Sequence, residues 1–325
     1  MKKLFFVGMV LVLLFGCKKD STVYLGNWIK KSDFEGIPRG NAASFVIGDK
    51  VYVGTGYNSD QTNEYLSDFW MYDTTRDFWT KLTDFPGEPR IGSVSFTING
   101  KGYMGVGYNG KVKLKDFWEF DPATNLWTRK ADFGGSARYD AVGFALGSKG
   151  YLGTGYDDYE NRDFWQYDPS TNQWSQIASM GGSKRRDAVA FTINEKAYVC
   201  TGTSNGSSMT DLWEFDPTTG AWTEKAKIDY DTSWTIVRTY ASAFTLGSKS
   251  YVCLGYNSGV RIDTWEYDPT GDTWLKKSDF EGSARQNAVS FVVNNRAYVA
   301  IGRSSSYFFS DIWEFNPFDA LDTDD

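Results

Sequence analysis

The chain has 325 residues, a formal net charge of −7 and no histidine, and 17 % of its residues are aromatic. An acidic chain lacks the basic surface that a nucleic-acid binder needs to neutralise phosphates, so we expect no nucleic-acid partner. The absence of histidine excludes Ser-His-Asp and Cys-His catalysis and histidine-ligated zinc or copper, so any chemistry must use carboxylates, Tyr, Arg, Lys or hydroxyl groups.

Residues 1–17 have the pattern of an export signal. Lys2 and Lys3 precede an apolar run that is shorter than the ~20 residues needed to span a bilayer. The segment ends in Leu-Phe-Gly-Cys, which resembles the lipobox of bacterial lipoproteins. The resemblance implies that Cys17 is lipidated, that residues 18–24 form a polar tether, and that the protein is exported and anchored at a bacterial membrane, at the outer membrane or the cell surface. An ordinary secretory leader with an incidental cysteine is the alternative.

Beyond the tether, one tryptophan-containing phrase recurs six times, roughly 50 residues apart, which is typical of blade-type repeats. Within residues 39–85, four runs of alternating apolar and polar residues are separated by turn residues, which indicates four short antiparallel strands, a to d. The phrases begin at Asp68, Asp116, Asp163, Asp211, Asp263 and Asp311.

The repeats resemble the kelch repeat, in which an apolar strand ending in glycine precedes an aromatic residue and a tryptophan at a fixed distance. The corresponding strands here read YVGTG, YMGVG, YLGTG, YVCTG, YVCLG and YVAIG, each followed by an Asp-x-Trp phrase. They differ from the family in having Gly-x-Gly or a single glycine in place of an adjacent pair. The resemblance implies an all-β fold, a six-bladed kelch-type β-propeller over residues 25–318.

The two ends of the chain complement each other. The sixth repeat lacks a second tryptophan nine residues after Trp313, whereas residues 27–34 match residues 273–280 of the fifth repeat. We therefore expect the N-terminal segment to supply strand d of the last blade and so to close the ring, which removes exposed strand edges. Residues 319–325 are predicted to form an acidic tail.

The loops predict which face of the propeller carries a site. The arginine that begins each strand a always lies 17 residues before the strand-b glycine, so the turns of one face do not vary. The b–c and d–a loops of the other face do vary, and binding sites concentrate on loops held by a rigid scaffold. The alternative is that these loops vary in length only because nothing constrains them. We expect ligand contacts at the channel mouth from Tyr57, Tyr108, Tyr156 and Tyr256, which follow their glycines, and from Tyr230 and Trp234 in the longest d–a loop.

The repeated arginines allow two interpretations. In kelch proteins that this chain resembles, arginines at this position can contact acidic ligands, which implies a ligand-binding ring. The alternative is that a residue present in all six blades pairs with loop carbonyls or with the Asp-x-Trp carboxylates. The residues two positions further differ from blade to blade, which can shape a pocket. The arginines are Arg39, Arg90, Arg138, Arg185, Arg238 and Arg285, and the variable residues are Asn41, Gly92, Asp140, Asp187, Tyr240 and Asn287.

Three functions are compatible with these features. The first is a non-enzymatic binding module that recognises a glycan or an envelope protein with its loop face, with membrane contact through the lipid anchor only. The second, implied by the kelch resemblance, is an enzyme similar to a sialic acid mutarotase or epimerase, for which Asp140 and Asp187 are the candidate proton carriers. The third is a structural subunit. The sequence contains no catalytic, metal or cofactor motif, and the copper oxidases among kelch proteins are excluded because their site needs histidine.

Overall fold

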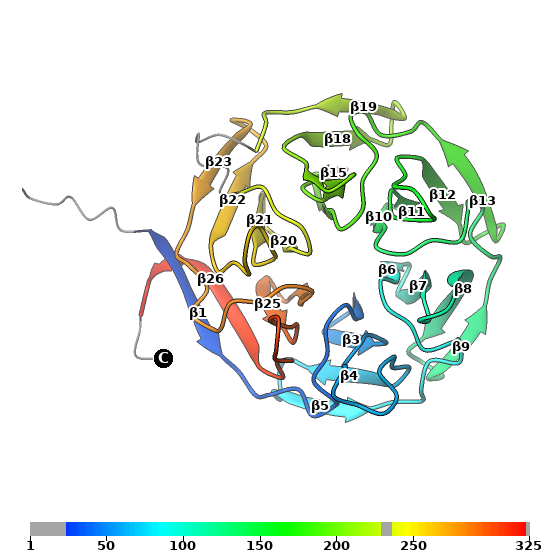
Figure 1. Cartoon of the computed structure of the whole chain (residues 1–325), viewed down its shortest axis with the longest axis horizontal. Helices are drawn as coiled ribbons and strands as arrows, with labels where there is room; N and C mark the ends of the chain where they lie inside the picture. Colours follow the sequence, from blue (N-terminus) through cyan, green and yellow to red (C-terminus); the bar gives the residue numbers. More distant parts are fainter. Residues whose placement is uncertain (1–23, 229–235, 323–325) are drawn as a thin grey trace, which may run out of the picture.

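The computed structural model describes residues 24–228 and 236–322, in which all helix and strand structure is β-strand. Six sheets of four antiparallel strands, the blades, surround a central axis (Figure 1). The predicted all-β, six-bladed propeller is confirmed. Cys17, Tyr230 and Trp234 lie outside the described residues. No helix of the described part has the length and apolar character needed to cross a membrane.

Blades are numbered from the N-terminus and their strands follow the chain, with one exception in the last blade. Blade one contains β2 (Ala43–Ile47), β3 (Lys50–Gly54), β4 (Phe69–Asp73) and β5 (Phe78–Lys81); blade two β6 (Val94–Ile98), β7 (Lys101–Tyr108), β8 (Lys113–Asp121) and β9 (Leu126–Arg129); and blade three β10 (Val142–Leu146), β11 (Lys149–Gly153), β12 (Phe164–Asp168) and β13 (Gln173–Ile177). Blade four contains β14 (Val189–Ile193), β15 (Lys196–Cys200), β18 (Leu212–Asp216) and β19 (Ala221–Glu224); blade five β20 (Ser242–Leu246), β21 (Lys249–Cys253), β22 (Thr264–Asp268) and β23 (Thr273–Lys276); and blade six β24 (Val289–Val293), β25 (Arg296–Ala300), β26 (Ile312–Ala320) and β1 (Leu25–Lys30). A small ribbon of β16 (Thr203–Ser204) and β17 (Ser207–Ser208) lies in a loop of blade four.

The exception is β1, which closes the ring by pairing with β26 (Figure 1). Trp28 lies opposite Phe315 in this pairing and is fully buried, with its ring 4.9 Å from that of Phe280. The closure predicted from the sequence is confirmed. Strand β26 continues to Ala320, which pairs with Leu25, so the last blade includes the first two residues of the predicted tail.

Alternating side chains build the contacts between blades. In β6, Val94, Phe96 and Ile98 are buried while the residues between them are only partly covered, as expected for a strand with one apolar face. The second tryptophan of a blade packs on aromatic rings of the preceding blade, for example Trp127 at 5.0 Å from Phe69. These aromatic contacts fill the space between blades, as the sequence predicted.

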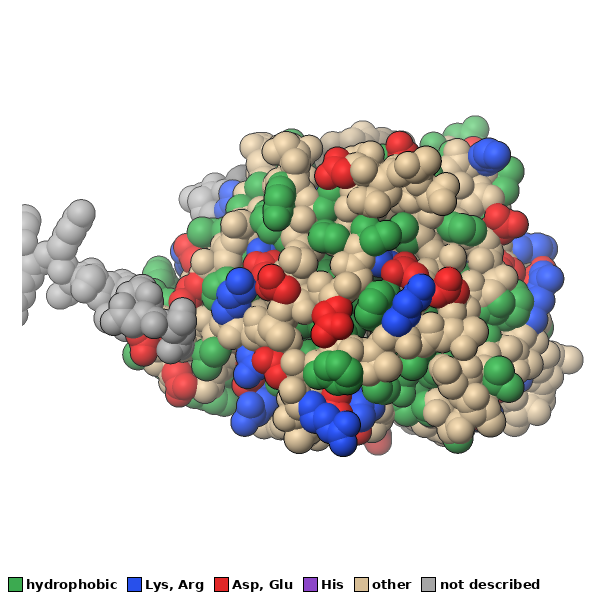
Figure 2. Space-filling view, turned by 90° about the horizontal axis from the view of Figure 1, so that it is seen from below, with side chains coloured by type: hydrophobic (Ala, Val, Ile, Leu, Met, Phe, Trp, Pro, Cys, Tyr) green, Lys and Arg blue, Asp and Glu red, His purple; other side chains and the backbone are tan. Residues whose placement is uncertain are grey.

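The surface and the axis differ in character. In an edge-on view, acidic and basic side chains are mixed over the outer surface (Figure 2). The first strand of each blade contacts the first strands of both neighbouring blades, so these six strands surround the axis. The axial end of each strand a is therefore where residues from all six blades come together.

Candidate functional site

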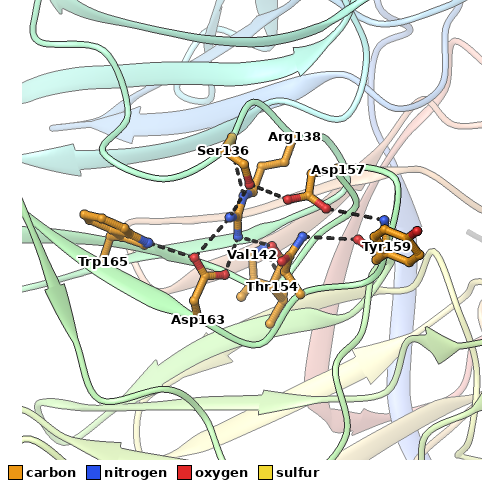
Figure 3. Close-up of polar contacts among 9 residues, drawn as sticks. Ser136, Arg138, Val142, Thr154, Asp157, Tyr159, Asp163 and Trp165 are labelled. Atoms are coloured by element: carbon orange, nitrogen blue, oxygen red, sulfur yellow. Dashed lines mark hydrogen bonds and ion pairs between the residues drawn. The ribbon is translucent and has the colours of Figure 1, made fainter.

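The six repeated arginines lie inside the blades. Arg138 is 1 % exposed, and its two terminal nitrogens donate to the Asp163 carboxylate at 2.6 and 3.0 Å (Figure 3). The same carboxylate accepts a hydrogen bond from the indole nitrogen of Trp165 at 2.8 Å. Residues two apart in an extended segment point to the same side, so the Asp and Trp of the Asp-x-Trp phrase can contact each other. The phrase thus encodes an acceptor for a buried arginine.

The buried arginine also supports a strained turn. Arg138 donates to the carbonyl oxygen of Thr154 at 2.9 Å, and Thr154 has a φ of 62°, a left-handed conformation that disfavours β-branched side chains. All six blades repeat this arrangement, so it is architectural. The expectation that these arginines contact ligands must be corrected, because their charged groups are buried in ion pairs, as the second interpretation required. The corrected residues are Arg39, Arg90, Arg138, Arg185, Arg238 and Arg285.

The residues two positions after these arginines form a ring around the axis, which we call the inner ring. All six have a left-handed backbone, with φ between 52° and 61°. The amides of five of them bond to carbonyls of the neighbouring blade, for example Asp187 N–H to Asp140 O at 3.1 Å. The next residue of each blade is alanine or serine, which leaves a channel of about 120 Å³ between the strands. The inner ring consists of Asn41, Gly92, Asp140, Asp187, Tyr240 and Asn287.

A second cavity of about 270 Å³, the mouth pocket, opens directly onto this channel and shares four inner-ring residues with it. Its walls come from all six blades, so no single repeat contains the site. Its lining residues are Gly40, Asn41, Tyr57, Tyr65, Ile91, Tyr139, Asp140, Arg186, Tyr240, Asn287 and Arg303.

An arc of tyrosines follows one side of the mouth pocket. Neighbouring rings lie 5.3 to 6.3 Å apart in the order Tyr57, Tyr65, Tyr108, Tyr139 and Tyr156. The structure thus brings together three of the four tyrosines that the sequence singled out, and Tyr57 lines the pocket itself. The fourth predicted tyrosine does not belong to this arc: Tyr256 is 45 % exposed and is absent from the pocket wall.

Two further arginines line the mouth pocket, and each occurs in one blade only. Arg186 follows the repeated Arg185, where other blades have Gly, Ile, Tyr, Thr or Gln; Arg303 stands where other blades have Tyr or Thr. Neither side chain donates a hydrogen bond within the described ranges. The Arg186 guanidinium lies over the Tyr156 ring at 4.6 Å, and Gly40 leaves room for Arg303, whose side chain would be 3.3 Å from a Cβ added there. Sequence reasoning missed both residues, although comparing the repeats position by position would have found them.

Asp140 and Asp187, the acidic pair, occupy adjacent inner-ring positions. Asp140 reaches across the ring to Asn41, whose side-chain nitrogen donates to it at 3.2 Å. The Asp140 side chain can cross this space because blade two has a glycine there: a Cβ added at Gly92 would lie 2.5 Å from the Asp140 carboxylate. The Asp187 side chain is 1 % exposed. Among the described residues, neither of its oxygens accepts a hydrogen bond of normal geometry, and Arg186 at 3.5 Å and the Tyr240 hydroxyl are its polar neighbours.

The surroundings shift the pKa of both carboxyls upward. Burial raises the pKa of Asp140, while hydrogen bonds with Asp187 and Asn41 offset part of the rise. Burial and the adjacent charge of Asp140 raise the pKa of Asp187 well above its usual range. Both shifts favour the protonated form of the pair. Among residues 24–228 and 236–322, no group of three or more acidic or cysteine side chains is arranged as a metal site.

Comparisons with known proteins agree with this architecture. A model described as the KLHDC2/KLHL20/DRC7 Kelch-repeats domain matches residues 29–190, and the Kelch motif matches residues 184–227. The solved structure of YjhT superposes with a TM-score of 0.72 at 18 % identity, covering 87 % of this chain and 96 % of that one, which shows a shared fold.

Curated relatives match over a shorter stretch. The N-acetylneuraminate epimerases of Shigella sonnei (strain Ss046) and Escherichia coli (strain K12) are each 32 % identical to this chain over 94 residues. The match covers 28 % of this chain and 26 % of each relative, so it spans about a quarter of the curated proteins.

Proposed function

The chain belongs to the kelch-repeat family, and from this premise we propose that it is a binding module that holds a small acidic sugar in the mouth pocket. The observation that carries the proposal is the contrast between two classes of arginine. Six are repeated, buried and paired with the Asp-x-Trp carboxylates, whereas Arg186 and Arg303 are unique to their blades, line the pocket and donate no side-chain hydrogen bond to the described chain. Arg186 has only a 3.5 Å ion-pair contact with Asp187. Guanidinium groups with free donors are suited to a carboxylate, which they bind in a planar, bidentate manner.

The rest of the pocket suits a sugar. Its volume of about 270 Å³ is at the small end for ligand sites, which favours a single sugar residue over a segment of an envelope protein. The tyrosine arc offers flat apolar faces with hydroxyl groups at their edges, and Asn41 and Asn287 offer amides for sugar hydroxyls. The curated relatives are named for N-acetylneuraminate, a sugar acid, which supports an acidic ligand.

Calorimetric titration of the purified chain with N-acetylneuraminate tests the proposal. We expect Arg186→Gln and Arg303→Gln each to weaken binding roughly tenfold or more, because a charge-assisted hydrogen bond contributes about 1.5–3 kcal/mol. Arg162→Gln is the matched control, since Arg162 is an exposed loop arginine outside the pocket and should bind as the wild type does. Absence of binding by the wild type, or equal binding by all three variants, contradicts the proposal.

A second candidate function is exchange of the sugar's anomers. It is favoured by Asp140, a carboxyl with a raised pKa that faces both the pocket and the channel. In this reaction Asp140 takes the proton of the anomeric hydroxyl, the ring C–O bond breaks as the carbonyl forms, and the ring oxygen takes a proton from water; reclosure reverses these steps.

Saturation-transfer NMR of N-acetylneuraminate separates the two functions. An enzyme accelerates exchange over buffer, and Asp140→Asn abolishes the acceleration while binding remains. A pure binding module leaves the exchange rate at its buffer value.

We also propose that the pocket is presented at a bacterial membrane through a lipid on Cys17, as the sequence pattern suggests. Fractionation of cells that produce the full chain tests this placement. We expect the wild type in the membrane fraction and Cys17→Ser in the soluble exported fraction. Equal membrane association of the two forms contradicts lipidation.

A further inference from the structure

We propose that Asp187 retains a proton that it shares with Asp140, and that the mouth pocket holds an acidic ligand only while this proton is in place. This inference rests on the proposed function, because it concerns the same pocket. It adds a dependence on proton concentration that neither the family nor the relatives' names contain.

The first support is the geometry of Asp187. Its carboxyl is 1 % exposed, and no donor of the described chain makes a hydrogen bond of normal geometry to either oxygen, although Arg186 and the Tyr240 hydroxyl lie nearby. An ionised Asp187 would therefore be a buried charge with poorly placed partners. The carboxyl of Asp140 lies within hydrogen-bonding reach. Two carboxyls bond to each other only when one of them carries a proton, so the arrangement calls for a proton between them.

The second support is that Asp140 cannot move away. Asn41 of blade one holds its side chain by the 3.2 Å hydrogen bond, and the space beside Gly92 admits it. The backbone of the inner ring fixes the other side, since Asp187 N–H bonds to the Asp140 carbonyl. The two carboxyls are therefore held together by the scaffold, and both have raised pKa values because of their burial and proximity.

The groups facing the pair decide what ionisation would do to a ligand. Arg186 lies beside Asp187, while the hydroxyl of Tyr240 and the ring of Tyr139 approach from blades five and three. Asn41 and Asn287 are neutral, and Arg303 completes the pocket wall. With one shared proton the pair has a charge of −1 against two arginines, which leaves a net positive site. Loss of the proton makes the pair −2 and cancels the attraction for an anion.

The coupling between proton binding and ligand binding has a definite sign and size. Binding that requires one proton becomes weaker as pH rises above the second ionisation of the pair, with a limiting slope of about tenfold in Kd per pH unit. Binding in that range takes up as much as one proton per ligand. Asp187→Asn mimics the protonated form, because asparagine has the same shape, can donate to Asp140 and tolerates the left-handed backbone at this position.

Titration calorimetry with N-acetylneuraminate between pH 5.5 and 9 tests the inference, with buffers of different ionisation heat reporting proton uptake. We expect the wild type to lose affinity at alkaline pH, and Asp187→Asn to bind equally at all pH values and more tightly than the wild type at pH 9. Asp60→Asn, an exposed loop acid outside the pocket, makes the same change in charge and should follow the wild type. A wild type with pH-independent affinity overturns the inference while leaving the proposed function intact.

A measurement without ligand keeps the two proposals separable. In the ligand-free chain labelled with ¹³C at aspartate carboxyls, we expect one signal with the shift of a protonated carboxyl at pH 7, absent in Asp187→Asn and present in Asp60→Asn. If that signal appears but no form binds the sugar, the acidic pair stands and the proposed function fails. If every aspartate is ionised at pH 7, the inference is wrong whatever the sugar does.

Discussion

At the scale of single residues, this propeller uses arginine in two ways that the sequence distinguishes only by repetition. Arg39 and its five equivalents are held by a carboxylate and by the carbonyl of a left-handed residue, so they stabilise the turn where strand b ends. The sequence placed these arginines at the axial end of strand a but left their role open. Their burial shows that this role is structural, and that burial depends on how strands b and c fold over the arginine side chain.

Removing the acidic partner should therefore cost much stability. Asp68→Asn leaves Arg39 as a buried charge with an incomplete partner, and breaking such a pair costs about 3–5 kcal/mol of unfolding free energy. Urea unfolding monitored by tryptophan fluorescence measures the loss. Asp60→Asn, the same chemical change in an exposed loop, should leave the urea midpoint within error of the wild type. Equal midpoints for the two variants would show that the pair is dispensable.

Gly92 gives a second prediction at this scale. Gly92→Ala places a methyl group in the space that the Asp140 carboxylate occupies, so we expect this carboxylate to move and sugar affinity to fall by about tenfold or more. Gly147→Ala is the matched control, because Gly147 has a similar φ of 56° and open space around its Cα. Calorimetry should separate the two variants, and equal affinities would mean that the position of Asp140 is unimportant.

At the scale of elements, the N-terminal strand shows what repeat comparison achieves. Residues 27–34 copy the end of the fifth repeat closely enough to predict β1 and its partner. The end of β26 was harder to predict, because Pro317 suggested that the strand stops there. The strand continues past Pro317, since a bulge between Leu25 and Asn27 shifts the pairing where proline lacks a donor.

Closure by β1 should be energetically important. Trp28→Ala removes a fully buried indole that contacts Phe280 and Phe315, and large aromatic deletions in cores cost about 3–5 kcal/mol. Trp222→Ala, at the equivalent strand of blade four but only partly buried, should cost less. Differential scanning calorimetry compares the two. An unchanged melting temperature for Trp28→Ala would contradict the role of the closing strand.

At the scale of the whole molecule, the candidate site belongs to no single repeat. The sequence predicted that variable inner-ring residues can shape a pocket, and that pocket exists. It could not predict that Asp140 and Asp187 share one polar cluster with Asn41, because that contact depends on the direction in which the Asp140 side chain crosses the space beside Gly92. The arginines that line the pocket, Arg186 and Arg303, stand at positions that vary from blade to blade, so they did not stand out from ordinary loop variation. Tyr230 and Trp234 remain predictions.

The repeated ion pairs predict how the ring responds to acid. Burial alone would raise the pKa of their aspartates, but the paired arginines outweigh it and hold the pKa below the usual 3.8 in Asp68, Asp116, Asp263 and Asp311. Carboxyls with lowered pKa values contribute stability that is present above pH 3.8 and is lost as pH falls through their folded values. We expect the melting temperature, followed by circular dichroism, to fall steeply below pH 3.8. A constant melting temperature between pH 4 and pH 2 would be inconsistent with these pairs.

The inner ring has one further consequence. Asparagine, glycine, aspartate and tyrosine all adopt the same left-handed turn there, and the amide-to-carbonyl bonds between blades use backbone atoms alone, so these bonds do not require one particular side chain. The side chains that line the pocket and the backbone bonds that join the blades are therefore separate features of the inner ring. Exchanging residues at these six positions is a direct way to change what the scaffold recognises.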